Sequence, residues 1–509
     1  MDFYLFIAIV FYMLVLLSIG YYSYKKTTNI NDYMLGGRDL GPAVTALSAG
    51  ASDMSGWMLM GLPGAVFAAG LSQMWIAVGL TVGAYLNYLL LAPKFRVYTE
   101  VANDSMTIPD FLENRFKDTS RMLRLISGTL ILVFFVLYVS SGVVAGGKLF
   151  ISSFGLSYTL GVVITLSVVV LYTFFGGFIA VSLTDFFQGC LMFVTIIAVP
   201  VVAYMNIDMA PGTFVEQITA INPSLFDIFK GTSVIGIISL LAWGLGYFGQ
   251  PHIIVRFMAI KSTSELKSAR RIGIGWMAFG LLGAVASGMT GLVYLNQKGI
   301  KLEDPETVFL VLGDILFHPF ITGIILAAVL AAIMSTISSQ LLVCASSVTQ
   351  DFYLTFFKKD ISDKKKIVIS RCAVVGVALV ATIFAYLDNK SILNIVGQAW
   401  AGFGCSFGPV ILMSLYWRRM TKWGALSGML AGGLTVIGWI SARGFISTMG
   451  VPAPDFLISM LSMYEMVPGF LASLIATYVV SKFTAKPEGV DADFDKMDAI
   501  LLEDSKKIS

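Results

Sequence analysis

The residues of this chain best suited to chemistry include a carboxylate inside an apolar run. Asp53 lies in LSAGASDMSGW, together with Ser55 and two glycines. An unpaired carboxylate at mid-span costs about 2.5–3.5 kcal/mol on insertion scales, so something must compensate its charge. A cation in transit, a water-filled cavity or nearby backbone amides would each do so. The pattern favours a cation site, with structural capping of a helix break as the alternative.

A second group consists of hydroxyl side chains in AAIMSTISSQLLVCASS, where Ser335 and Thr336 are adjacent. Taken alone, such a pair more often bonds to the carbonyl four residues earlier or to a neighbouring helix. Hydroxyl and carbonyl oxygens are also the hard ligands that a small alkali cation needs when it loses its water. An unwound segment around Asp53 would supply free carbonyls beside them. Together the two segments predict a cage for an ion of the size of sodium.

Two aromatic residues and a proline recur every four positions in LLAWGLGYFGQPH, where Trp243, Tyr247 and Pro251 would share one face of an α-helix. Such a face is apolar and partly able to hydrogen-bond, so a compact apolar solute would fit against it. Packing against lipid or protein explains the spacing equally well, and only the flanking glycines favour close approach to a ligand. Tyr138 is a further candidate, although a single tyrosine in a span more often packs than binds.

The remaining polar residues say less about the function of the chain. Asp185 lies near the start of an expected span, where it would either guard a cation path or lie at the interface. His252 and His318 lie near expected helix ends, where a histidine is more often structural than part of a proton relay. Residues 404–408 match GxSxG, but inside an apolar helix they lack the strand, turn and helix that a nucleophile of this type requires. These features give an enzyme no support.

The elements that must hold these residues are membrane-spanning helices. The chain has 509 residues and is 57% hydrophobic and 13% charged, whereas soluble domains are roughly 45–50% apolar and about 25% charged. A net charge of +3 without a basic face gives nucleic-acid binding no support. Apolar runs of about 20 residues predict an all-α polytopic membrane protein. We expect thirteen spans, at 3–23, 42–62, 72–93, 124–151, 158–178, 187–206, 233–251, 272–295, 318–346, 367–387, 391–416, 424–443 and 463–482.

The basic residues predict the orientation of these spans. Most of the 34 Lys and Arg residues fall after the first, third, seventh, ninth and eleventh spans and in the C-terminal tail. Because cytoplasmic loops are enriched in these residues, the pattern places the N-terminus outside and the C-terminus in the cytoplasm. The expected transporter domain covers 1–483. The tail, 484–509, is mixed in charge and is expected to be solvated or to form a surface-lying helix.

Two of the expected spans contain residues that weaken regular helical hydrogen bonding. They are the second span, at 42–62, and the seventh, at 233–251, and five spans separate their starts. Spans 2–6 (42–206) and 7–11 (233–416) would therefore form two repeats of opposite orientation, each opening with its interrupted helix. Unwound backbone at the interface of such repeats is where transporters bind ion and solute.

The strings quoted above resemble the sodium/solute symporter family, in particular its bacterial sodium/proline symporters. The similarity extends to GGRDLGP before the second span and to RMTKWGALSGMLAG before the twelfth, and it covers all thirteen spans. The resemblance implies the following roles for single residues: sodium coordination at Ala51, Met54, Ala332, Ser335 and Thr336, support of sodium coupling at Asp53 and Ser55, proline contact at Tyr138, Trp243, Tyr247 and Pro251, sodium access at Asp185, and a role at the cytoplasmic face for Arg38.

The resemblance further implies sodium-coupled secondary uptake of L-proline across the bacterial cell membrane by alternating access. It implies no cofactor beyond the coupling ion, sodium as the only metal, and no obligatory protein partner. Related family members carry other solutes on a similar scaffold, so a sodium-coupled symporter of another small organic solute is the alternative. A channel is less well supported, because it would need a continuous polar pore and only scattered polar residues occur.

Overall fold

The computed structural model describes residues 3–26, 29–357, 361–386, 391–449 and 454–508. Within these ranges the chain is helical and contains no β-strand, which confirms the predicted all-α class. Three of the sequence-based boundaries lie outside the described residues. They are the start of the transporter domain at residue 1, the end of a span at 387 and the end of the tail at 509.

The first half of the chain contains fourteen helical elements within the described ranges, in which α denotes α-helices and η short 3-10 or π turns. They are α1 (Phe3–Lys26), α2 (Ile30–Leu35), η1 (Gly36–Arg38), α3 (Pro42–Asp53), η2 (Trp57–Gly61), α4 (Leu62–Ala69), η3 (Gly70–Gln73), α5 (Met74–Leu86), η4 (Asn87–Leu91), α6 (Ala92–Val101), α7 (Ile108–Arg115), α8 (Met122–Phe154), α9 (Tyr158–Met205) and α10 (Phe214–Ile221).

The second half follows the same all-helical pattern. Its described elements are α11 (Val234–Leu241), η5 (Ala242–Gly249), α12 (Pro251–Ala259), η6 (Thr263–Glu265), α13 (Leu266–Gln297), η7 (Pro305–Thr307), α14 (Val308–Leu316), α15 (Pro319–Ser346), η8 (Ser347–Leu354), α16 (Asp363–Ala385), α17 (Ile392–Tyr416), α18 (Lys422–Met449), α19 (Asp455–Leu461), α20 (Met466–Phe483) and α21 (Val490–Ile508).

Ten helices in the described ranges are long and apolar enough to cross a membrane, and one bent pair, Val234–Gly249 with Pro251–Ala259, adds an eleventh. The difference from the expected thirteen arises where helices break or join. The helix α3 has only 12 residues, and a single run, Trp57–Val101, contains the end of the second expected span and the whole of the third. The apolar helix Tyr158–Phe174 is at the lower limit of the length that a membrane span requires.

The helix α9 joins two of the expected spans, 158–178 and 187–206. It has 48 residues, which as a straight helix would extend about 72 Å, far beyond the roughly 30 Å of a hydrocarbon core. Gly177 interrupts it with φ of 57° and ψ of −156°, a conformation in which a side chain would be strained. A Cβ there would lie 2.6 Å from the Tyr33 ring. The glycine therefore divides α9 into two arms.

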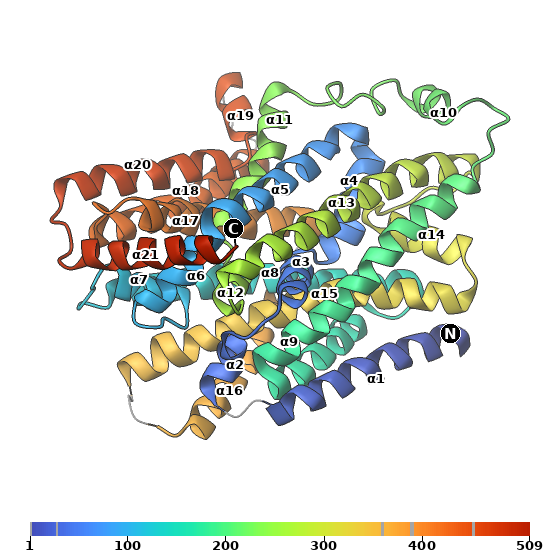
Figure 1. The fold of residues 1–509 in the computed structure, drawn as a ribbon. Coiled ribbons are helices and arrows are strands. Elements are labelled where there is room, and N and C mark those ends of the chain that lie inside the picture. Colours follow the sequence, from blue (N-terminus) through green and yellow to red (C-terminus); the bar gives the residue numbers. More distant parts are fainter. Residues whose placement is uncertain (1–2, 27–28, 358–360, 387–390, 450–453, 509) are drawn as a thin grey trace.

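The interrupted helices lie between two groups of packed helices. On one side α17, α18 and α20 contact one another, and on the other side α1, α9 and α15 do so (Figure 1). The helix α3 packs on α9, α13 and α15, whereas η5 packs on α17 and α5. The most hydrophobic stretches of α15 and α17 are 83% and 89% buried. Polar groups on these helices therefore meet protein rather than lipid.

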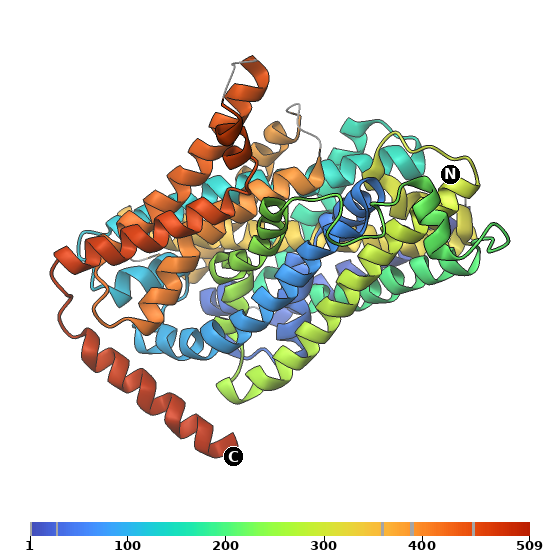
Figure 2. The ribbon, with the colours of Figure 1, turned by 90° about the horizontal axis from the view of Figure 1, so that it is seen from above.

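The C-terminal helix α21 lies outside this bundle and runs along its surface next to α6 (Figures 1 and 2). Val490, Phe494 and Met497 form its buried face. Its acidic residues pair with basic loops of the transporter. Arg418 is 2.6 Å from Asp495 and 3.1 Å from Asp498, and Lys117 is 2.6 Å from Asp493. The tail thus combines an apolar anchor with exposed ion pairs.

Candidate functional site

The predicted interruption of the second span is present. The helix α3 ends at Asp53, Met54 takes φ of −79° and ψ of 75°, and the chain becomes helical again at Trp57. The Asp53 carbonyl accepts hydrogen bonds from the backbone N–H of Ser55 at 2.9 Å and from the Trp57 indole at 3.0 Å. A Cβ on Gly56 would lie 2.8 Å from the Ala145 side chain, so only glycine allows this close packing.

The hydroxyl pair of α15 contacts this break. The Ser335 Oγ donates to the Ala51 carbonyl at 2.7 Å and lies 3.1 Å from the Ala332 carbonyl. The Thr336 Oγ1 lies 3.4 Å and 3.2 Å from the same two oxygens. All four residues are buried. The structure therefore brings two carbonyl and two hydroxyl oxygens together, a neutral set of hard ligands suited to sodium.

The Asp53 side chain contacts the other interrupted helix. The Tyr247 hydroxyl donates to Asp53 Oδ2, and Oδ1 has no hydrogen-bond partner among the described residues. Asp53 and Tyr247 also line one small cavity of about 30 Å³ together with Asn87, Tyr88 and Met277. The acid expected at the cation site therefore bonds directly to a residue expected at the solute site.

The interruption of the seventh span is also present, but it has a different form. The helix α11 continues as η5, Gln250 is extended with φ of −85° and ψ of 106°, and α12 begins at Pro251. Glycines let η5 approach its neighbours closely. A Cβ on Gly246 would lie 2.0 Å from Trp400 Nε1, and one on Gly244 would lie 2.2 Å from the Gly79 carbonyl. Larger residues at either position would separate η5 from α17 or α5.

Trp243 is held by aromatic neighbours. Its ring stacks on Tyr464 with centroids 5.3 Å apart and an interplanar angle of 19°, and its carbonyl accepts a 2.8 Å hydrogen bond from the Trp400 indole. It also lines a cavity of about 450 Å³ at the junction of η5, α17, α18 and α20, here called the Trp243 cavity. The cavity wall includes Gln73, Ser239, Trp243, Gln398, Arg443, Tyr464 and Glu465.

The four residues expected to contact the solute do not line one cavity. Tyr247 borders the small cavity with Asp53, whereas Pro251 borders a third cavity beside Asp351. The Tyr138 ring lies edge-on to His252 at 5.6 Å, and its buried hydroxyl has no partner among the described residues. The expected common face assumed α-helical geometry. Because η5 is a 3-10 helix with about three residues per turn, a spacing of four rotates each side chain away from the last.

Asp185 forms a fully buried ion pair with Arg256, at 3.2 Å from the Arg256 guanidinium to Asp185 Oδ2. Ser48 of α3 donates to the same oxygen at 2.8 Å, and Ser339 of α15 lies 3.4 Å from it. Four helices therefore meet at one carboxylate. Sequence reasoning missed Arg256, although a lone arginine within PHIIVRFMA, so close to apolar residues, needs an anionic partner if buried.

Arg38 joins η1 to the end of α12. Its guanidinium donates to the carbonyls of Met258 and Ser105, both at 2.8 Å, and pairs with Asp104 at 3.0 Å. Burial lowers the pKa of Arg38 from its usual value, while the charge of Asp104 opposes the shift. Arg38 therefore ties together segments far apart in the sequence.

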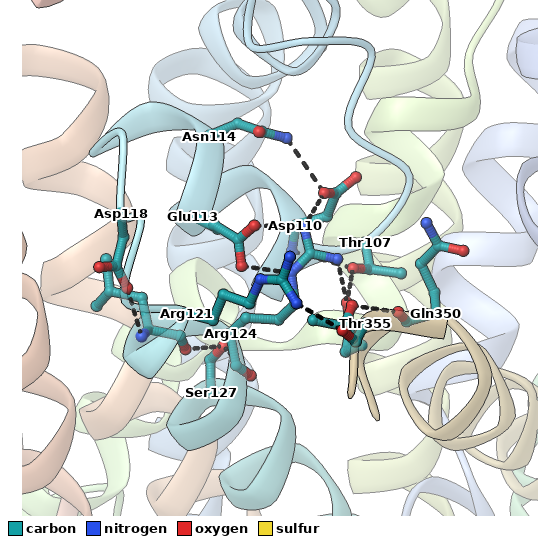
Figure 3. Close-up of polar contacts among 12 residues, drawn as sticks. Thr107, Asp110, Glu113, Asn114, Asp118, Arg121, Arg124, Ser127, Gln350 and Thr355 are labelled. Carbon is teal, nitrogen blue, oxygen red and sulfur yellow. Dashed lines mark hydrogen bonds and ion pairs between the residues drawn. The ribbon is translucent and has the colours of Figure 1, made fainter. Parts of the chain in front are cut away.

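A charged cluster that the sequence did not indicate lies nearby (Figure 3). Arg124 of α8 pairs with Glu113 at 2.7 Å, with Asp351 at 3.4 Å and with Asp110. Thr107 donates to Asp351 at 2.8 Å. The cluster connects α7, α8 and η8. A single arginine thus pairs with three acids, and it gives the fully buried Asp351 a cationic partner.

Comparison with known proteins places the chain in a family. The model of the sodium:solute symporter family matches residues 33–432. The chain belongs to this family. It is therefore a transporter rather than an enzyme, and its coupling ion is sodium. Its helices make it a multi-pass membrane protein.

Several relatives of this symporter are similar over nearly their whole length. It is 57% identical to the high-affinity proline transporter PutP of Bacillus subtilis (strain 168), covering 94% of this chain and 98% of the relative. It is 56% identical to the osmoregulated proline transporter OpuE of the same organism, covering 94% of each. A sodium/proline symporter of Staphylococcus aureus (strain NCTC 8325 / PS 47) is 54% identical, covering 98% and 96%.

Solved structures share the fold of the symporter. A substrate-bound, outward-open Na⁺-coupled sialic acid symporter aligns with a TM-score of 0.77 at 18% identity, covering 96% of this chain and 99% of that one. The nucleobase-cation-symport-1 family transporter Mhp1, in a closed conformation, aligns with a TM-score of 0.53 at 12% identity, covering 91% and 98%. At these identities the likeness is one of fold.

Proposed function

We propose that this symporter couples the entry of sodium to the uptake of L-proline across the bacterial cell membrane by alternating access. The observation that carries the solute assignment is 54–57% identity, over nearly the full chain, to relatives named as proline transporters. The alternative of another small organic solute has no comparable support. No cofactor and no second protein is part of the proposal.

Sodium binds between the break after α3 and the middle of α15. Its ligands are the carbonyls of Ala51, Met54 and Ala332 and the hydroxyls of Ser335 and Thr336. The convergence of four of these residues, with oxygen separations of 2.7–3.4 Å, supports the assignment. An ion there would take the place of hydrogen bonds among neutral oxygens. The ligands themselves are uncharged, so the only charge they bring into the membrane interior is that of the bound ion.

Proline binds beside the break at η5, and its contacts with Tyr138, Trp243, Tyr247 and Pro251 require a conformation other than this one, since here these residues do not line one cavity. The hydrogen bond from Tyr247 to Asp53 supports a direct link between solute and ion. Asp53, with Ser55, acts in coupling. Binding of one ligand reorganises the partner of the other, and the two ligands must then increase each other's affinity by equal factors.

Asp185 and Arg38 act in ion access and in closing the cytoplasmic side. The N-terminus lies outside and the C-terminus in the cytoplasm, with domain boundaries at 483 and 484. Thirteen spans include the repeats 42–206 and 233–416, which rock against each other. The role proposed for Arg38 is supported by its hydrogen bond to the Met258 carbonyl at the end of α12. Arg96, which is distant in sequence, bonds to the Ile260 carbonyl at the same helix end.

The driving force suffices for accumulation. One charge moving inward through 100 mV yields about 2.3 kcal/mol, equivalent to roughly fiftyfold accumulation of the solute, and the sodium gradient adds to it. Labelled proline uptake into liposomes tests the proposal, with an inward sodium gradient compared with an equal potassium gradient at matched membrane potential. Concentrative uptake only with sodium is expected. Uptake that is equal in both gradients would contradict coupling to sodium. The absence of uptake would contradict the assignment of proline as the solute.

A further inference from the structure

The buried carboxylate of Asp351 in η8 borders a cavity that three hydroxyl side chains also line. This cavity, here called the Asp351 cavity, has a volume of about 20 Å³ and lies between η8, α7 and the start of α12. Thr107, Ser346 and Ser347 contribute the hydroxyls. A volume of about 10–15 Å³ is enough to hold one water molecule, and a sodium ion is smaller than water. The cavity therefore has room for a single small cation.

The two carboxylate oxygens of Asp351 have different surroundings. Oδ1 accepts a 2.8 Å hydrogen bond from Thr107 and lies 3.4 Å from the Arg124 guanidinium. Oδ2 has no hydrogen-bond partner among the described residues, and neither has the buried Ser347 hydroxyl. Leaving a buried carboxylate oxygen without a partner costs free energy, which a cation beside it would offset.

The charges around this oxygen do not balance. Arg124 is the shared partner of three acids, Asp110, Glu113 and Asp351, whose side chains are between 0% and 19% exposed (Figure 3). No other cation in the described part of the chain lies within ion-pair distance of these acids. With all four groups ionised, the cluster has an excess of two negative charges. Such an excess in a poorly solvated region attracts a cation.

A row of buried polar side chains connects this cluster to the proposed sodium site. Ser335, Ser339, Ser347 and Asp351 recur at multiples of four residues along α15 and η8, close to one helix face. Ser339 also lies 3.4 Å from Asp185, for which a role in ion access is proposed. At about 1.5 Å per residue, Asp351 lies roughly 24 Å along the helix from Ser335. The row therefore extends from the proposed sodium site towards one membrane surface.

That surface is the cytoplasmic one in the proposed orientation. The helix α7 and the end of η8 adjoin two segments rich in Lys and Arg, 94–124 and 358–371. Loops of this composition are enriched on the cytoplasmic side of membranes. An ion that leaves the sodium site along the row would pass the cluster last.

We propose that the Asp351 cavity is an inner sodium site, which holds the ion on its way to the cytoplasm. Asp351 Oδ2 and the Ser347 hydroxyl are its ligands, and the excess negative charge of the cluster attracts the ion. Sodium that enters from the cytoplasm binds at the same place and opposes release. The inference rests on the proposed function for the orientation of the chain, and it does not depend on which solute is carried.

Asp351→Asn is the substitution that tests this site. It removes the negative charge with little change in shape, and Arg124 keeps its other two acidic partners. Ser347→Ala removes the second ligand without changing any charge. Asp363→Asn is the matched control, because Asp363 pairs with Lys366 at 3.0 Å near the same membrane surface but outside the cavity.

The test uses initial rates of labelled proline uptake into right-side-out membrane vesicles, with outside sodium and the membrane potential fixed. Sodium replaces choline inside the vesicles, and the inside sodium concentration that halves the rate is determined. Asp351→Asn should raise this concentration about tenfold or more, and Ser347→Ala should raise it less, because a charged ligand contributes more than a neutral one. The half-saturating outside sodium concentration should stay within about twofold, because Asp351 is distant from the proposed sodium ligands.

Equilibrium binding of radiolabelled sodium to the purified full-length protein in lipid nanodiscs, without proline, gives a second measurement. The unsubstituted protein should show two saturable components. Asp351→Asn should lack the weaker component, and Ser335→Ala combined with Thr336→Ala should lack the tighter one. The melting temperature of each variant measures any purely structural loss.

The inner site would be refuted if inside sodium inhibited Asp351→Asn as strongly as the unsubstituted protein, or if this variant kept both binding components. It would equally be refuted if Asp351→Asn raised the inside and outside sodium concentrations by the same factor, because the acid would then act on the central site. Absence of proline uptake would contradict the proposed solute, whereas loss of the weaker sodium component in Asp351→Asn would still support the inner site. The two proposals therefore fail on different measurements.

Discussion

The two helix breaks differ in what surrounds them. The break after α3 is enclosed by oxygen atoms, since the Ala51 carbonyl meets the hydroxyls of Ser335 and Thr336. The break at η5 is enclosed by aromatic rings and glycine backbone, with Trp400 against Gly246 and Tyr464 against Trp243. The oxygen atoms at the first break agree with the proposed sodium site, and the rings at the second agree with the proposed solute site.

Under the proposed function, the same kind of helix break would serve two different ligands. Unwinding a helix frees carbonyls, but the side chains opposite decide what those carbonyls can do. The hydrogen bond from Tyr247 to Asp53 joins the two breaks directly. Under the proposed function this hydrogen bond would be a short physical path for coupling between ion and solute, and substitutions on either side of it test whether the two breaks are separate in function.

The largest expected effect is on the packing of η5. Gly246→Ala would place a Cβ 2.0 Å from Trp400 Nε1, and the buried Trp400 has no room to move. We expect a loss of about 3 kcal/mol or more in the free energy of unfolding, at the upper end for overpacking, together with loss of uptake. The melting temperature of purified protein measures it.

Gly438→Ala is the control for that substitution, because no atom lies within 4 Å of the added Cβ. It should leave stability and uptake unchanged. A stable and active Gly246→Ala protein would mean that η5 does not pack against Trp400 as described.

The next effect is on the oxygen cluster. Ser335→Ala combined with Thr336→Ala removes two hydroxyls and should raise the half-saturating sodium concentration roughly 100-fold, at about 1–1.5 kcal/mol for each contact. Sodium dependence of proline uptake measures it. Ser338→Ala is the control on the same helix, since its hydroxyl bonds to the Ser335 carbonyl and not to Ala51. If Ser338→Ala had the same effect as the double substitution, the hydroxyls of Ser335 and Thr336 would not be ligands of the ion.

A third prediction addresses the link between the breaks. Asp53→Asn should raise the half-saturating sodium concentration about tenfold, with little change in protein level, because a charge near the ion is lost. Tyr247→Phe should also weaken sodium binding, although less. In a double-mutant cycle the two effects should not add, with a coupling of about 1 kcal/mol. Strict additivity would show that the two breaks act independently.

The smallest effect is expected at the solute side alone. Trp243→Ala removes the ring that stacks on Tyr464 and should raise the half-saturating proline concentration about five- to tenfold, since an aromatic pair contributes about 0.5–1.5 kcal/mol. The half-saturating sodium concentration at saturating proline should stay within about twofold. Trp75→Ala serves as the control, because Trp75 bonds to the Ile228 carbonyl away from η5. A normal proline affinity in Trp243→Ala would show that Trp243 does not contact the solute.

The sequence predicted both breaks because their causes are local. Helical hydrogen bonding is weakened at the first break by Asp53 and the two glycines near it. At the second break it is weakened by the glycines and the proline around Tyr247. The hydroxyl pair on α15 was also expected to lie beside the first break, and the structure places it against the Ala51 carbonyl. Residue type therefore predicted where the helices break, and the ion and solute sites expected there stay predictions.

What the sequence did not predict depends on pairings between distant segments. Arg256 lies 71 positions from Asp185, and nothing local indicates that they meet. The 3-10 form of η5 likewise depends on its packing against α17 and α5, so the spacing of Trp243 and Tyr247 gave a face that does not exist. Length and hydropathy identify ten or eleven of the thirteen expected spans among the described helices, because breaks interrupt the apolar runs on which such counts depend.

The docking of α21 gives the symporter a contact whose two parts respond oppositely to salt. Exposed ion pairs such as Arg418 with Asp495 weaken as the Debye length falls from about 8 Å at 0.15 M to about 3 Å at 1 M. The contact of Phe494 and Met497 with the bundle is not screened. In concentrated salt the helix therefore stays attached through its apolar face while losing the charges that fix its direction. We therefore expect the tail at high salt to change its orientation about the apolar contact while it stays bound to the bundle.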